Sequence, residues 1–201
     1  MTRPLPCDAF PRRIETGRLY LRPPEEGEAA LYARHAQEAY ATQPEPISDD
    51  EARAFAAFML GHWERYGFGF FVIDIADGFG QRISIGHAGF KYVDAWPNHW
   101  PQSYNAIELG YSVVPSARGR GYVTEAARAV LTAAFAALDV PSIRAKCRHD
   151  NPKSAAVLLR CGMTELEATE GTRRFEIARP ATVQIAGPFK DSGDRDEDFG
   201  F

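Results

Sequence analysis

The stretch VVPSARGRGYVTEA, residues 113–126, decides the fold of this chain. It follows an apolar and aromatic run at 106–114 that is typical of a strand, and it opens an alanine-rich, periodic segment at 124–138 that is typical of a helix. The first N–H groups of a helix lack intrahelical partners and carry a partial positive charge, which suits them to anions. Gly119 and Gly121 let a ligand approach, and Arg118 and Arg120 suit phosphate oxygens. The sequence therefore suggests a phosphate site in this turn.

Two common phosphate motifs do not fit the turn. The nucleotide loop G-x-x-x-x-G-K-[ST] requires a lysine where Val123 stands, and the dinucleotide fingerprint G-x-G-x-x-G requires a small residue where Thr124 falls. A glycine pair of this kind is also common in ordinary turns between a strand and a helix. The turn alone thus leaves an ordinary connection and a site for another phosphate ligand both open.

Longer segments resemble a known family. The segments ELGYSVVP (108–115) and RGRGYVTEA (118–126) resemble the acyl-coenzyme A signature of the GNAT acetyltransferase superfamily, within it the branch that includes ribosomal-protein N-terminal acetyltransferases. The segment ETGRLYLRP (15–23) is similar to the opening strand of that branch, and NPKSAAVLLRCGM (151–163) is similar to one of its helices. Together these pieces cover residues 15–178.

The resemblance implies a mixed α/β GNAT fold, with a mostly antiparallel central sheet of about seven strands flanked by about four helices. It implies one N-acetyltransferase domain at 14–180. We expect residues 1–13 to form an irregular leader that packs late or not at all, and residues 181–201 to form an extension with a disordered, acidic end.

The resemblance also implies acetyl-CoA as the cosubstrate. In this family the central strand pairs with the pantetheine arm, at positions that match Val113 and Val114, and the turn binds the pyrophosphate. The residues implied to bind the cofactor are Val113, Val114, Arg118, Gly119, Arg120, Gly121, Tyr122, Val123, Thr124, Asn151 and Ser154. The superfamily pattern prefers Gln or Arg where Ser116 stands, and we expect Arg118 to compensate.

Catalysis of acetyl transfer requires a neutral amine, a route for its proton, a polarised thioester carbonyl and help for the departing thiolate. The resemblance implies Glu108 as the base; the alternative is an outward-facing or ion-paired Glu. Backbone N–H groups near Val113 are expected to polarise the carbonyl. Many relatives carry an acid tyrosine where Leu158 stands, so Ser154 is the remaining catalytic candidate, unless it bonds only to backbone.

Two helices are predicted in the first half of the chain, at 24–41 and after the capping box SDDE at 48–51. The second carries an aromatic stripe that belongs either to the core or to an acceptor pocket. Further strands are predicted at 18–22, 69–76, 83–93 and 142–148, a helix at 151–161, and two strands between 163 and 177. The loop at 94–104, with two Trp residues, either covers the sheet or contributes to acceptor recognition.

Composition limits the class further. With 201 residues, 45% of them hydrophobic, the chain suits one globular domain, and its net charge of −4 argues against a nucleic-acid binder. Cys7, Cys147 and Cys161 match neither a disulfide framework nor a zinc site, and the five histidines show no metal-ligand spacing. We expect free thiols, no metal, no membrane partner and a cytoplasmic location.

The sequence thus predicts an enzyme that transfers acetyl from acetyl-CoA directly to a primary amine, either a protein N-terminus or a small molecule. A homodimer is a further possibility, because many relatives dimerise. The alternative is an acyl-CoA-binding module without turnover, suggested by Leu158 and Ser116. A basic cluster at 144–153 either meets the 3′-phosphate of coenzyme A or is a solvated strand edge.

Overall fold

The computed structural model describes residues 9–40, 47–92, 106–166 and 171–181. Its strands are β1 (Ile14–Glu15), β2 (Leu19–Arg22), β3 (Phe70–Ala76), β4 (Arg82–Tyr92), β5 (Ile107–Val113), β6 (Ser142–Arg148), β7 (Thr164–Glu165) and β8 (Thr172–Ala178). Its α-helices are α1 (Ala29–Tyr40), α2 (Asp49–Tyr66), α3 (Tyr122–Ala137) and α4 (Pro152–Arg160), and short 3-10 turns cover Glu26–Glu28 and Pro115–Ala117.

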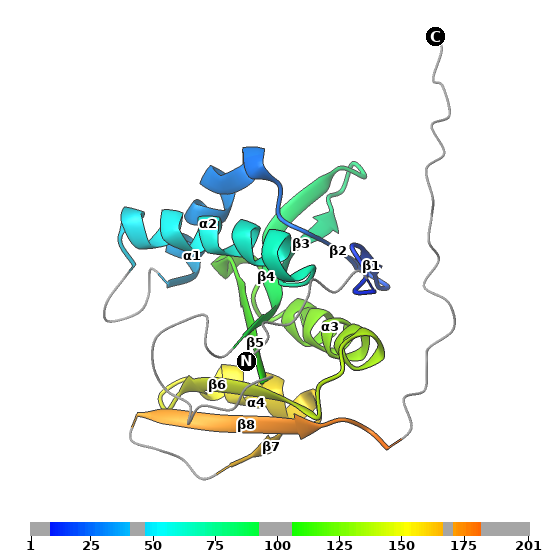
Figure 1. The fold of residues 1–201 in the computed structure, drawn as a ribbon. Coiled ribbons are helices and arrows are strands. Elements are labelled where there is room, and N and C mark those ends of the chain that lie inside the picture. The colour runs from blue at the N-terminus through cyan, green and yellow to red at the C-terminus, as the bar shows by residue number, and fades with distance from the viewer. Residues whose placement is uncertain (1–8, 41–46, 93–105, 167–170, 182–201) are drawn as a thin grey trace.

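The eight strands form one sheet in the order β1-β2-β3-β4-β5-β6-β8-β7. Every neighbouring pair is antiparallel except β5 and β6, which are parallel. Helices α1 and α2 lie on one side of the sheet and α3 on the other, with α4 beside β6 (Figure 1). The predicted mixed α/β fold is confirmed, with eight strands in place of about seven.

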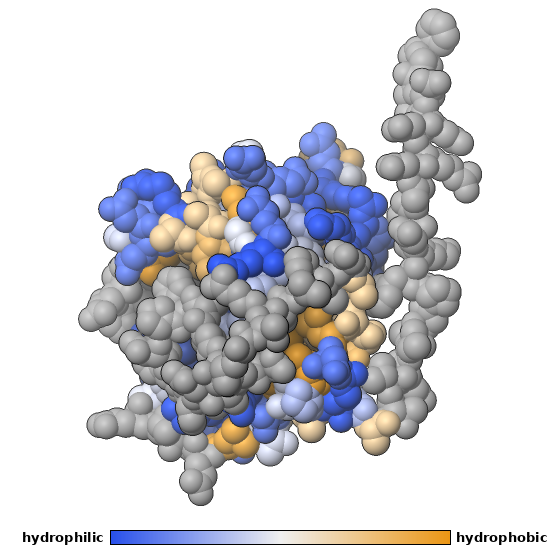
Figure 2. All heavy atoms as spheres, in the orientation of Figure 1, coloured by the Kyte–Doolittle hydropathy of each residue, from blue (hydrophilic) through white to orange (hydrophobic). Residues whose placement is uncertain are grey.

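The sheet buries side chains on both faces, because alternate residues of a strand point to opposite sides. Phe71 and Ile73 of β3 belong to the larger core, which also contains most of the inner face of α3. Phe70 and Val72 belong to a smaller cluster with Met59 of α2. The described surface is largely hydrophilic in the view of Figure 2, with an apolar area over α3.

Helix α2 begins where its sequence predicts. The Ser48 hydroxyl accepts a hydrogen bond from the N–H of Glu51, and the Glu51 carboxylate accepts one from the N–H of Ser48, which completes the capping box. Gly67 ends the helix in the left-handed region, at a φ of 72°. The indole N–H of Trp63 donates to the carbonyl of Phe70 at 2.8 Å, so this part of the aromatic stripe belongs to the core.

The leader differs from the prediction at Phe10. This side chain is only 3% exposed, and its ring packs against the rings of Trp63, Phe68 and Phe71 at centroid distances of 5.8–6.0 Å. A single aromatic residue outside a periodic segment gives no sequence signal of burial. Phe10, at the end of the predicted irregular leader, is therefore part of the core.

Several predictions lie outside the described residues: those on Cys7, on one of the five histidines, His99, on the loop 94–104 and on the acidic end of the extension 181–201. Within the described ranges, no helix is long and apolar enough to cross a membrane, and no group of His, Cys, Asp and Glu could hold a metal ion. Cys147 and Cys161 are buried free thiols, as the sequence predicted.

The buried His87 of β4 predicts a stability that depends on pH. Its ring packs against Phe55 and Phe70, and burial lowers its pKa from 6.5 to about 3, assisted by the charge of His35. Between these two pKa values the unfolded chain binds a proton that the folded chain does not. Stability should therefore fall as the pH drops from 6.5 towards 3, by at most about 1.4 kcal/mol per pH unit for this residue.

We expect His87→Phe to make this dependence shallower, as measured by urea midpoints at a series of pH values. His35 and His62 are also buried with lowered pKa values, so part of the dependence should remain. An unchanged slope in the variant would contradict this account of His87.

Candidate active site

The parallel strands β5 and β6 pair over only the first part of β5. The paired residues are Ile107–Leu109 and Ile143–Ala145, whereas β4 stays paired with β5 as far as Val113. Beyond Leu109 the two strands separate, and β6 runs in a clearly different direction from β5 (Figure 1). In the described part of the chain, this separation leaves one edge of β5 without a strand partner after Leu109, so its backbone can pair with an extended, amide-bearing ligand.

A groove of about 1730 Å³ lies at this separation. Its walls are the last residues of β5 and β6, the turn before β2, the loop before α3, and residues along α3 and α4. Small-molecule pockets usually measure about 300–1,000 Å³, so this groove has room for a longer ligand.

One end of the groove carries the loop that the sequence singled out. Gly119 and Gly121 have φ values of 75° and 80°, a region that favours glycine, and α3 begins directly afterwards at Tyr122. The helix starts two residues before the predicted Thr124, because Gly121 serves as its N-cap. Among the described residues, no side chain forms a capping hydrogen bond at this helix start, and the groove reaches it. The N-terminus of α3 thus faces the groove at the place where the sequence predicts an anion site.

Most of the residues implied to bind the cofactor line the groove: Val113, Arg118, Gly119, Gly121, Tyr122, Val123, Thr124, Asn151 and Ser154. Val114 and Arg120 are not among its lining residues. The N–H of Val114 donates to the carbonyl of Ile85 at 2.9 Å, so this amide serves the sheet. The carbonyl of Arg120 accepts a hydrogen bond from Arg18 at 2.9 Å.

Two hydroxyl groups meet on the wall of the groove. Asn151 caps α4 by accepting the N–H of Ser154 at 3.1 Å. The Ser154 hydroxyl lies 3.1 Å from the phenol oxygen of Tyr111, which also donates to the Ser154 carbonyl at 3.0 Å. Burial raises the pKa of Tyr111 well above its ordinary value, which keeps the phenol protonated. Leu158, at the position of the missing tyrosine, lies in the core.

The sequence indicated Tyr111 only as part of the motif ELGYSVVP and gave no role for its phenol group. Its place beside Ser154 depends on the separation of β5 from β6, which brings β5 next to α4. No local pattern in the sequence signals a contact of this kind.

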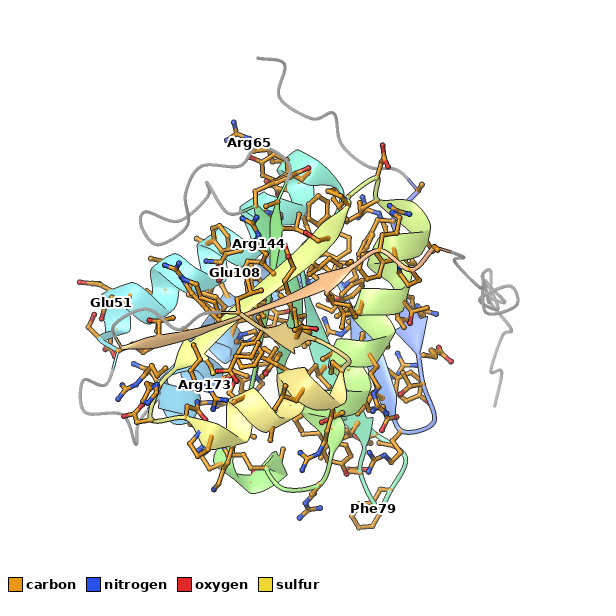
Figure 3. All side chains as sticks on the ribbon, turned by 90° about the horizontal axis from the view of Figure 1, so that it is seen from below. Glu51, Arg65, Phe79, Glu108, Arg144 and Arg173 are labelled. Atoms are coloured by element: carbon orange, nitrogen blue, oxygen red, sulfur yellow. The ribbon has the colours of Figure 1, made fainter. Side chains whose placement is uncertain are left out.

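Glu108 lies on the opposite face of β5 from Tyr111, and its side chain is 7% exposed. Its carboxylate is 3.3 Å from the ammonium of Lys91 on β4 and 3.8 Å from that of Lys146 on β6. It is also the register partner of Arg144, and Figure 3 shows the two residues near each other. The ion-paired alternative for Glu108 is therefore present in the structure. The carboxylate does not line the groove, but Lys146 does.

The residues of the basic cluster at 144–153 fall into two groups, inside and outside the groove. Lys146, Arg148 and Lys153 line the groove, and burial lowers the pKa of Lys146. Arg144 instead forms an ion pair with Glu176 at 3.3 Å, outside the groove. His149 is exposed and is not a lining residue either.

A sheet whose two parallel strands part beside a glycine loop and a helix start defines an N-acyltransferase fold. Residues 18–164 match the family described as the acetyltransferase (GNAT) domain, and the chain belongs to this family. The GNAT acetyltransferase predicted from the sequence is thereby confirmed.

Individual relatives agree with this assignment. The curated FsC-acetyl coenzyme A-N(2)-transacetylase of Aspergillus fumigatus is 27% identical over 158 residues, which cover 71% of this chain and 64% of that relative. The chain thus spans less than two thirds of the length of this curated relative. A crystal structure of an acetyltransferase from Agrobacterium tumefaciens is 26% identical with a TM-score of 0.62, over 82% of this chain and 93% of the other.

A third relative shares the fold at lower identity. The structure of RimL, the ribosomal L7/L12 alpha-N-protein acetyltransferase, in complex with coenzyme A is 22% identical with a TM-score of 0.60. The match covers 83% of this chain and 97% of that chain.

Proposed function

We propose that this chain transfers the acetyl group of acetyl-CoA directly to a primary amine, with both substrates bound at once. The observation that carries the proposal is the groove, where the unpaired edge of β5 leads to two left-handed glycines and the start of α3. GNAT acetyltransferases use acetyl-CoA, and this chain belongs to that family.

The residues of the groove fit the parts of this cofactor. The backbone of β5 from Tyr111 to Val113 would pair with the amides of the pantetheine arm, and the N–H groups after Gly119 would hold the pyrophosphate. The cations along the rim, Arg118, Arg148 and Lys153, would attract the phosphate groups.

The transfer needs few chemical groups from the protein. The amine nitrogen forms a bond to the thioester carbonyl carbon, its proton passes through water to Glu108, and the carbon–sulfur bond breaks. The Ser154 hydroxyl, which lies against the phenol of Tyr111, would donate to the departing thiolate. An α-amine has a reference pKa of about 7.7–8.0 against about 10.4 for lysine, so an α-amine requires the weaker base.

The acceptor is either a protein N-terminus or a small-molecule amine. One named relative is an FsC N(2)-transacetylase and another is a ribosomal-protein acetyltransferase, so the named relatives do not point to a single acceptor. The proposal is tested with a panel of candidate acceptors that contains short peptides with different N-terminal residues and small mono- and polyamines. Release of the coenzyme A thiol, with mass spectrometry of the acceptor, measures transfer.

A second candidate is a binding module of the same fold without turnover, and the observation that favours it is the buried Leu158. The same panel separates the two. An enzyme releases thiol only when its amine is present and yields acetylated product. A binding module binds acetyl-CoA and gives neither result with any acceptor.

The hydroxyl pair yields a prediction of its own. Ser154→Ala should lower kcat by about 10-fold, because the thiolate of coenzyme A leaves with only modest assistance. Tyr111→Phe removes only the phenol oxygen beside Ser154 and should give a smaller decrease of the same kind. Steady-state kinetics at saturating acetyl-CoA measure the decrease in kcat in both variants. A kcat equal to that of wild type in Ser154→Ala would exclude the role of this hydroxyl.

A further inference from the structure

The turn between β1 and β2 contacts the first turn of α3, more than a hundred residues later in the chain. The carboxylate of Glu125 accepts hydrogen bonds from the Thr16 hydroxyl at 2.6 Å, from Nε of Arg18 at 2.7 Å and from the Arg18 backbone N–H at 3.1 Å. Nη2 of Arg18 lies 2.6 Å from the same carboxylate. An exposed ion pair with a single contact contributes little to stability. The Arg18–Glu125 pair is different, because several directed hydrogen bonds hold it.

The same arginine reaches the glycine loop. Nη1 of Arg18 donates to the carbonyl of Arg120 at 2.9 Å, and its guanidinium carbon lies 4.8 Å from the ring centroid of Tyr122. A Cβ atom at Gly121 would come within 3.4 Å of Nη2 of Arg18. Arg18 therefore touches the loop on both sides of the glycine that caps α3.

The negative charge of Glu125 lies at the end of the groove where phosphate groups would bind. Burial alone would raise the pKa of Glu125, but the hydrogen bonds from Thr16 and Arg18 lower it, so the group is a carboxylate at neutral pH. Glu125 and Arg18 both line the groove, at the end where the pyrophosphate would bind. Without Arg18, this carboxylate would repel phosphate oxygens and offset part of the attraction of the helix start.

We propose that Arg18 is a positioning residue for the pyrophosphate of coenzyme A, an inference that rests on the proposed function. Arg18 fixes the loop from Arg118 to Tyr122 through the carbonyl of Arg120, and it neutralises Glu125 beside the phosphate site. The opening segment ETGRLYLRP thus acts in cofactor binding although it lies far from the glycine loop in sequence.

The test is calorimetric titration with coenzyme A and with pantetheine, which lacks the pyrophosphate. Arg18→Met should weaken coenzyme A binding by about 10-fold and leave pantetheine binding unchanged. Adding Glu125→Gln to Arg18→Met should restore most of the affinity, because the uncompensated charge is removed. Thr16→Val, which removes one hydrogen bond, should weaken coenzyme A binding by about 2- to 3-fold.

The matched control is Arg173→Met. Arg173 forms a similar two-bonded pair with Glu165, at 2.7 Å for both contacts, away from the groove, so coenzyme A affinity should not change. Equal losses for coenzyme A and pantetheine, or a double variant no better than Arg18→Met, would overturn the role of Arg18. Wild-type protein that binds neither ligand would instead overturn the proposed function itself.

Discussion

Glu108→Gln is expected to lower kcat by about 100- to 10,000-fold, the range typical of a lost general base. Acetyl-CoA affinity should stay the same, because Glu108 lies on the face of β5 away from the groove. The loss should be largest below the pKa of the acceptor amine, where the amine must give up a proton before or during attack. Kinetics over a range of pH, with calorimetric titration of acetyl-CoA, measure both effects.

The control must separate catalysis from the ion pairs that Glu108 makes with Lys91 and Lys146. Glu176→Gln removes a carboxylate on β8 that pairs with Arg144 on β6. Both residues lie outside the groove. We expect Glu176→Gln to retain most of kcat. Equal and small effects of the two substitutions would mean that Glu108 is only an ion-pair partner.

Gly119→Glu is expected to weaken acetyl-CoA binding by about 100-fold. Two effects act together: a side chain is strained at a φ of 75°, and the new carboxylate would lie beside the pyrophosphate. Within the part of the chain that the structure describes, no atom lies within 4 Å of the added Cβ, so that atom meets no clash there. Calorimetric titration measures the dissociation constant directly.

Gly80 provides the matched substitution. It lies in the turn between β3 and β4, has a φ of 82°, and also has open space around its Cβ position. Gly80→Glu therefore brings the same charge and a similar backbone strain, but outside the groove. Its acetyl-CoA affinity should match that of wild type. A comparable loss in both variants would mean that strain or net charge, not the loop, explains the effect.

Local signals were enough to predict most of the fold. The alternation in Ser142–Arg148 placed β6 at its observed bounds, and the capping box at Ser48 placed the start of α2. The start of α3 was predicted two residues late, because Gly121 caps it without a side chain. Burial of Phe10 was missed, since it depends on rings from distant segments of the chain.

The site was predictable as a set of motifs but not as a set of contacts. The glycine loop could be located because its spacing is local. The pairs Tyr111–Ser154 and Arg18–Glu125 join residues far apart in sequence, and only the packing of β5, α3 and α4 brings them together. The lysines on both sides of Glu108 follow from strand register, which a single sequence does not specify.

The most direct measurement of the central claim is calorimetric titration of the wild-type protein with acetyl-CoA. We predict saturable binding of one acetyl-CoA per chain in the micromolar range, and thiol release once a suitable amine is added. Absence of binding would mean that the groove and its glycine loop do not serve a coenzyme, and the proposed acetyl transfer would be contradicted.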